Sequence, residues 1–101
     1  MKVMLKQERE TVIRMQLHGT LAAGQWRQVL AEFENLSRKG IHTLIVDMED
    51  VPVVDSLGLA ALIAGYRMFG SDGTRFHLEN LSHQPQLLLQ VTGIDWLTSA
   101  V

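Results

Sequence analysis

The stretch IHTLIVDMEDVPVVDSLGLAALI, residues 41–63, indicates the fold class of this chain. Its first eight residues, IHTLIVDM, are mostly apolar and rich in β-branched side chains, a pattern typical of a central strand buried on both faces. MEDVPVVDS follows as a loop, because Pro52 cannot donate to a strand ladder. LGLAALIAGYRMF, residues 57–69, then repeats apolar residues at helical steps. We therefore expect a buried strand, a polar junction and a packed helix.

Two short strands and a helix are predicted before this stretch. In TVIRMQLHG, residues 11–19, apolar and polar side chains alternate as in a half-buried strand. MKVMLK, residues 1–6, is expected to pair with it through a hairpin connection formed by QERE, residues 7–10. From about Ala22 to Lys39 the apolar residues recur every three or four positions, which predicts an amphipathic helix that ends at Gly40.

The remaining segment continues the alternation of strands and helices. SDG, residues 71–73, is predicted as a turn, TRFHLEN as a strand, and SHQPQLLLQVTG as a helix capped by Ser82 with Pro85 in its first turn. The short element that begins at Asp95 is not assigned a type. The order β-β-α-β-α-β-α predicts one α/β domain spanning residues 1–101, with a mixed sheet of four to five strands. The expected core contains Val29, Leu30, Phe33, Leu44, Ile45, Val46, Leu59, Leu62 and Ile63.

Composition excludes several classes of function. The 101 residues include no cysteine, so disulfides, cysteine-based zinc sites and thiol catalysis are excluded. No two of the four histidines stand three or four positions apart, the spacing that metal-binding pairs on a helix need. The net charge is −2 and the basic residues are scattered, which argues against nucleic acid as a partner. No apolar run approaches the roughly 20 residues that span a bilayer. We expect a cytoplasmic domain without cofactor, metal or membrane insertion.

The junction VDSLG, residues 54–58, allows three interpretations. A serine nucleophile of the Gly-x-Ser-x-Gly type needs glycine where Val54 stands, and the fragment Asp-Ser-Leu alone is weak evidence for an esterase. No base is placed by the sequence, so we predict no enzymatic activity. Alternatively, Asp55 or Ser56 caps the following helix, and Gly58 allows that helix to approach the sheet closely.

The third interpretation adds a switch to the cap. A serine at a helix N-terminus is exposed and faces unpaired N–H groups, so it can carry a phosphate without unfolding the domain. Phosphorylation of Ser56 would add about −1.5 to −2 charge. Glu49, Asp50 and Asp55 are close in sequence, so the phosphate would create a strongly negative patch.

The stretch VDMEDVPVVDSLGLAAL, residues 46–62, resembles the signature of STAS domains, in particular bacterial anti-sigma factor antagonists. LHGTLAAGQW resembles the family's entry into its first helix, and GTRFHLENLSHQPQLLLQVTGIDWL resembles its closing strand and helix. The resemblance implies a protein that binds an anti-sigma factor, itself a serine kinase, and is switched by phosphorylation at Ser56. Nucleotide would then belong to the partner. A STAS subunit of a lipid-transport ABC complex, or of a stressosome-type scaffold, is the alternative.

The resemblance also implies which residues contact the partner. They are Gly19, Ala22, Asp55, Ser56, Leu57, Gly58, Ala60 and Ala61. Three of them depart from the family pattern: Leu57 replaces a second hydroxyl residue, Ala60 replaces a frequent glycine, and Ala22 replaces an aspartate in the loop expected beside Ser56.

Two further features allow more than one interpretation. Trp26 and Trp96 are expected to anchor the core, although Trp26 is also placed to reach a partner surface. Ala60, Ala61, Ala64 and Gly65 give the helix after Ser56 a side of small residues. That side serves either tight packing inside the domain or a flat docking surface.

Overall fold

The computed structural model describes residues 1–22, 24–70 and 74–98. The elements in chain order are β1 (Lys2–Arg9), β2 (Val12–His18), α1 (Gln25–Arg38), β3 (Thr43–Asp50), α2 (Ser56–Met68), β4 (Phe76–Glu79), α3 (His83–Val91) and the 3-10 helix η1 (Asp95–Thr98). This confirms the predicted order β-β-α-β-α-β-α, and the unassigned final element is a 3-10 helix. The turn predicted at residues 71–73 lies outside the described residues.

The four strands form one mixed sheet in the order β1-β2-β3-β4. β1 and β2 are antiparallel, whereas β2, β3 and β4 run parallel to one another. The prediction that QERE forms the hairpin connection was wrong, because β1 continues through most of this segment. Gln7 still pairs with Ile13 and, after a bulge, Arg9 pairs with Val12. Only Glu10 and Thr11 form the turn.

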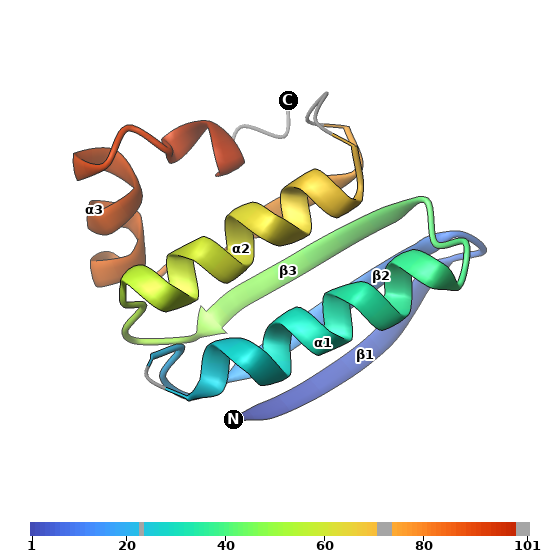
Figure 1. Cartoon of the computed structure of the whole chain (residues 1–101), viewed down its shortest axis with the longest axis horizontal. Coiled ribbons are helices and arrows are strands. Elements are labelled where there is room, and N and C mark those ends of the chain that lie inside the picture. The colour runs from blue at the N-terminus through green and yellow to red at the C-terminus, as the bar shows by residue number, and fades with distance from the viewer. Residues whose placement is uncertain (23, 71–73, 99–101) are drawn as a thin grey trace.

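α1 and α2 lie side by side against one face of the sheet, and α3 lies beyond one end of it, near the start of α2 (Figure 1). Most of the predicted core lies between these helices and the sheet: Val29, Phe33, Leu44, Val46, Leu59 and Leu62 are buried, and Ile63 packs against them. Leu30 and Ile45, however, are only half-buried. Ile45 lies on the opposite face of the sheet, in an open groove of about 430 Å³ that also contains Val12, Thr43 and His77. The prediction that this strand is buried on both faces was therefore wrong.

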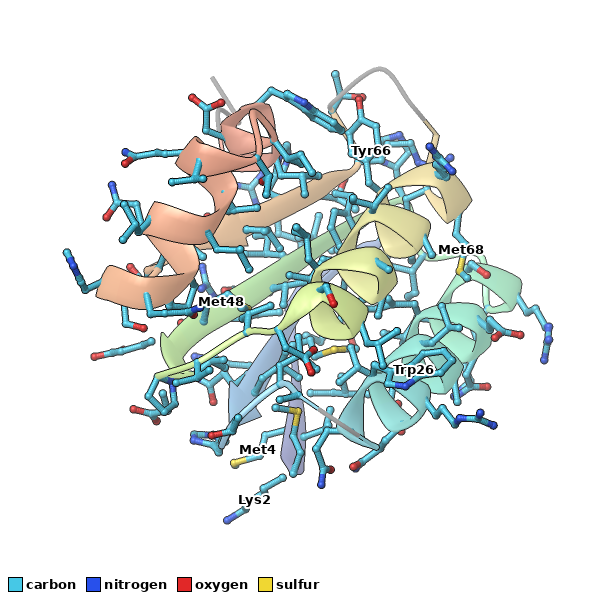
Figure 2. All side chains as sticks on the ribbon, turned by 60° about the vertical axis from the view of Figure 1, so that its left-hand side comes forward. Lys2, Met4, Trp26, Met48, Tyr66 and Met68 are labelled. Atoms are coloured by element: carbon cyan, nitrogen blue, oxygen red, sulfur yellow. The ribbon has the colours of Figure 1, made fainter. Side chains whose placement is uncertain are left out.

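The two tryptophans do not anchor the core, contrary to prediction. Trp96 is 47% exposed and its ring packs 4.9 Å from the ring of Tyr66. Trp26 is half-buried and belongs to the first turn of α1 (Figure 2). The guanidinium carbon of Arg27 lies 4.9 Å from the centroid of its ring. The core aromatics are instead Phe33, Phe69 and Phe76, all of which are fully buried. A helical stripe predicts which side of a helix faces the protein, but not how far the sheet extends beneath each turn.

The small residues of α2 mainly serve close packing inside the domain. A Cβ atom on Gly65 would lie 2.6 Å from the ring of Phe33, so α1 and α2 approach each other through this glycine. Ala61 is buried and Ala64 half-buried, whereas Ala60 is exposed. Packing inside the domain therefore accounts for Gly65 and Ala61. Ala60 is the one exposed residue of the four that a docking surface could use.

Arg14 connects all four strands across the open face of the sheet. Its guanidinium donates to Glu8 of β1, to Asp47 of β3 at 3.2 Å and to Glu79 of β4 at 2.9 Å. Burial by itself would raise the pKa of Asp47. Hydrogen bonds from Asn80 and from the Glu49 backbone, together with the Arg14 charge, nevertheless hold that pKa below its usual range. The ionised cluster therefore stabilises the sheet on the side that α1 and α2 do not cover.

Candidate functional site

The polar junction singled out in the sequence is the N-terminus of α2. Asp55 is the N-cap residue, and its Oδ1 accepts a hydrogen bond of 2.8 Å from the Gly58 backbone N–H. Ser56 is the first residue of the helix, and it is exposed. Of the two capping candidates, the structure therefore selects Asp55. The Ser56 hydroxyl lies at the helix end that bears the partial positive charge of the dipole.

The loop between β3 and α2 is held on one side by the segment that precedes α1. Leu21 N–H donates to the Val53 carbonyl at 2.9 Å, and Asp55 N–H donates to the Leu21 carbonyl at 3.1 Å. These two bonds form an isolated parallel bridge between Leu21 and Val54. These contacts confirm that the segment before α1 lies beside the start of α2. Ala22 follows Leu21 directly in this segment.

The same loop is held on its other side by the start of α3. The side-chain amide of Gln84 accepts from Val54 N–H at 2.9 Å and donates to the Val54 carbonyl at 3.0 Å. Ser82 is the N-cap residue of α3, as predicted, but its hydroxyl makes no capping bond and instead donates to the Val51 carbonyl at 2.6 Å. Polar contacts from two elements thus surround the backbone that leads into Ser56.

Gly58 allows a close approach, but to a different neighbour from the one predicted. A Cβ atom at this position would lie 2.3 Å from the carbonyl oxygen of Leu21 and 2.8 Å from its Cγ atom. The first turn of α2 therefore packs on the loop before α1 rather than on a strand. The glycine is needed for this contact, since no side chain fits between α2 and Leu21.

The predicted contact residues separate into an exposed and a supporting group. Ser56, Leu57 and Ala60 are exposed, Leu57 by 48%, whereas Gly58 and Ala61 are buried. Asp55, Gly19 and Ala22 are half-buried. Gly19 has a φ angle of +119° and its N–H donates to the backbone carbonyl of Asp50 at the end of β3, so this glycine shapes the loop.

Val53 is a further exposed residue beside Ser56, and it was not among the predicted contact residues. Its side chain is 40% exposed. Apolar Val53 and Leu57 both lie within three positions of the Ser56 hydroxyl.

Acidic side chains occur nearby, as the sequence indicated, but they are not equally available. Glu49 and Asp50 are exposed at the end of β3. The Asp50 carboxylate lies 2.8 Å from Nδ1 of His18, while the Asp55 carboxylate is engaged in the cap. Among the described residues, no group of three or more histidine, aspartate and glutamate side chains is arranged to hold a metal ion. The site consists of an exposed hydroxyl, the exposed apolar side chains Val53 and Leu57, and adjacent carboxylates.

Comparison with known proteins identifies the family. The mixed sheet with two helices on one face, and a loop that places a serine at the start of the second helix, define a small α/β domain. The family model described as STAS domain matches residues 3–99, and the chain therefore belongs to the STAS domain family. The resemblance noted in the sequence is thus confirmed at the level of the family. No curated protein sequence is similar enough to this chain to count as a match.

Two solved structures show the same fold. The anti-sigma factor antagonist SpoIIAA in its unphosphorylated form aligns with a TM-score of 0.82 and 19% identity, covering 96% of this chain and 85% of that one. The Bacillus cell fate determinant SpoIIAA in the phosphorylated form aligns with a TM-score of 0.73 and 21% identity, covering 92% and 85% of the two chains. At these identities the likeness shows a shared fold.

The described part of the chain contains no helix with the length and hydropathy needed to cross a membrane.

Proposed function

We propose that this STAS domain is a regulatory module of the anti-sigma factor antagonist type. It binds an anti-sigma factor that is also a serine kinase, and phosphorylation of Ser56 by that kinase ends the interaction. The observation that carries the proposal is the position of Ser56: exposed, first in α2, and next to the capping residue Asp55. The likeness to SpoIIAA in its unphosphorylated and phosphorylated forms supports a fold that tolerates phosphorylation.

The proposed module acts in the cytoplasm and catalyses no reaction itself. Nucleotide belongs to the partner, and the domain requires neither metal nor cofactor. Its role in binding rests on the exposed apolar residues Val53 and Leu57, which lose contact with water when a partner covers them. A phosphate on Ser56 would then lie within this dehydrated contact.

The energetic consequence of that phosphate is large. An exposed charge at the edge of an interface changes affinity modestly, whereas a buried charge without a partner costs about 2–5 kcal/mol. This range corresponds to a loss of binding of roughly 30-fold to several thousandfold. Phosphorylation therefore suffices to separate the two proteins without any change in fold.

Two departures from the family pattern favour a second function, a STAS subunit of a lipid-transport ABC complex or of a stressosome-type scaffold. Leu57 stands where the family pattern has a hydroxyl residue, and it is 48% exposed. Ala22 likewise replaces an aspartate in the loop beside Ser56. Both changes make the surface more apolar, which suits permanent assembly with a partner.

Affinity capture from the source cell's lysate distinguishes the two functions. We expect wild type and Ser56→Ala to recover the same small ATP-binding serine kinase, and Ser56→Glu to recover much less of it. Asn35→Glu adds the same charge on the exposed side of α1 and controls for charge in general; it should behave like wild type. Recovery of an ABC ATPase that is unaffected by either Ser56 variant would refute the antagonist function and support the second one.

A further inference from the structure

The backbone of Val54 is bonded as a strand residue would be, although it lies beyond the end of β3. On one side it forms the parallel bridge with Leu21. On the other side the Gln84 amide supplies both a donor and an acceptor, at 3.0 Å and 2.9 Å, which are the two groups that a neighbouring strand would offer. Gln84 therefore continues the sheet hydrogen-bonding pattern with a side chain.

This contact links α3 to the start of α2. Gln84 is in the first turn of α3, and Val54 immediately precedes the cap residue Asp55. A second contact from the same end of α3, Ser82 to the Val51 carbonyl, holds the loop three residues earlier. Pro85 and Leu89 bury the inner side of α3. The orientation of the two peptide groups that flank Val54 therefore depends on a helix that is not part of the STAS signature stretch.

We propose that Gln84 is a positioning residue for the Ser56 site. By holding the backbone N–H and C=O of Val54, which belong to two successive peptide groups, it sets the direction in which the chain enters α2. It thereby sets the placement of the Ser56 hydroxyl, two residues further on, and of the neighbouring Val53. The inference rests on the proposed function in that the positioned hydroxyl is the phosphoacceptor. Because a misplacement of about 1 Å can reduce a reaction rate roughly a hundredfold, release of this contact lowers phosphorylation without unfolding the domain.

Three variants test the contact. Gln84→Ala removes both hydrogen bonds. Gln84→Glu keeps the shape and still accepts from Val54 N–H, but it cannot donate to the Val54 carbonyl. Gln90→Ala removes an exposed glutamine from the same helix and is the matched control.

Two measurements are made on each variant. The first is amide hydrogen exchange by NMR at Val54. The amide of Leu44 in β3, which donates to the Arg75 carbonyl, serves as an internal reference. The second is the initial rate at which Ser56 is labelled by radioactive ATP in the source cell's lysate. For Gln84→Ala we expect exchange at Val54 to accelerate about tenfold or more, and labelling to slow about tenfold, with exchange at Leu44 unchanged. Gln84→Glu should slow labelling at least as much, because its second carboxylate oxygen would lie against the Val54 carbonyl, and Gln90→Ala should match wild type in both.

The outcomes separate this inference from the proposed function. Unchanged exchange at Val54 in Gln84→Ala, or wild-type labelling despite faster exchange, would overturn the positioning role. If wild type itself is not labelled, the phosphorylation switch is refuted. The positioning of the loop is then decided by exchange alone: faster exchange at Val54 in Gln84→Ala supports it, and unchanged exchange refutes it.

Discussion

Gly58→Ala should destabilise the domain, although alanine is the better helix former. The added Cβ would lie 2.3 Å from the Leu21 carbonyl oxygen, where real contacts of this kind are essentially never below 3.0 Å, so about 0.7 Å must open between α2 and the loop. That oxygen also accepts the Asp55 N–H, so moving it weakens a hydrogen bond. Overpacking of this kind costs about 1–3 kcal/mol and the weakened bond about 0.5–1.5 kcal/mol, against a gain of about 1 kcal/mol in helix propensity. The net loss is about 0.5–3.5 kcal/mol, with a central value of about 2 kcal/mol.

Urea and thermal unfolding of wild type and Gly58→Ala measure this loss. For a domain of about 100 residues, we expect the melting temperature to fall by roughly 5–20 °C. Ala60→Gly, an exposed position two residues further on, is the control: it reports the intrinsic difference between alanine and glycine in this helix, a loss of about 1 kcal/mol. If Gly58→Ala instead stabilises the domain by about as much as Ala60→Gly destabilises it, the predicted clash with Leu21 costs no free energy. That result would refute the structural role of Gly58.

Substitutions at two further positions test the cap and the buried carboxylate. Asp55→Ala should lower the free energy of unfolding by about 1 kcal/mol in chemical unfolding, because the Gly58 N–H loses its acceptor. Asp55→Asn can still cap and should cost much less, and equal losses for the two variants would show that the charge of Asp55 matters and not its capping bond. Asp47→Asn should cost about 1–3 kcal/mol at pH 7, since an amide places a donor against Arg14 or Asn80. Because the folded state lowers the pKa of Asp47, its contribution is complete above the unfolded pKa of about 3.9 and is lost as the pH falls through the folded value. The stability gap between wild type and Asp47→Asn should therefore narrow in unfolding curves below about pH 4, and a gap that stays constant down to pH 2 would contradict this explanation.

The fold was largely predictable because its signals are local and periodic. Alternation within residues 11–19 and the helical step within residues 57–69 each reflect a single element and its buried side. The errors in the predicted core occur where an apolar residue lies on a surface that the pattern does not identify. Ile45 is apolar like its buried neighbours Leu44 and Val46, yet it faces the open groove. Periodicity cannot state whether one or both faces of a strand are covered, since that depends on where helices from other segments pack.

The candidate site divides in the same way into local and distant contributions. The cap from Asp55 to Gly58 spans three residues, so residue types alone indicate it and place Ser56 at the helix start. The bonds from Gln84 to Val54 span 30 residues and leave no periodic trace, because a glutamine in the first turn of a helix has many equivalent uses. The motif therefore specifies which residue begins α2, whereas Leu21, Ser82 and Gln84 hold the loop that leads into it. A STAS chain that keeps the serine but lacks these distant contacts would have the residue for the proposed switch without the loop geometry on which that switch depends.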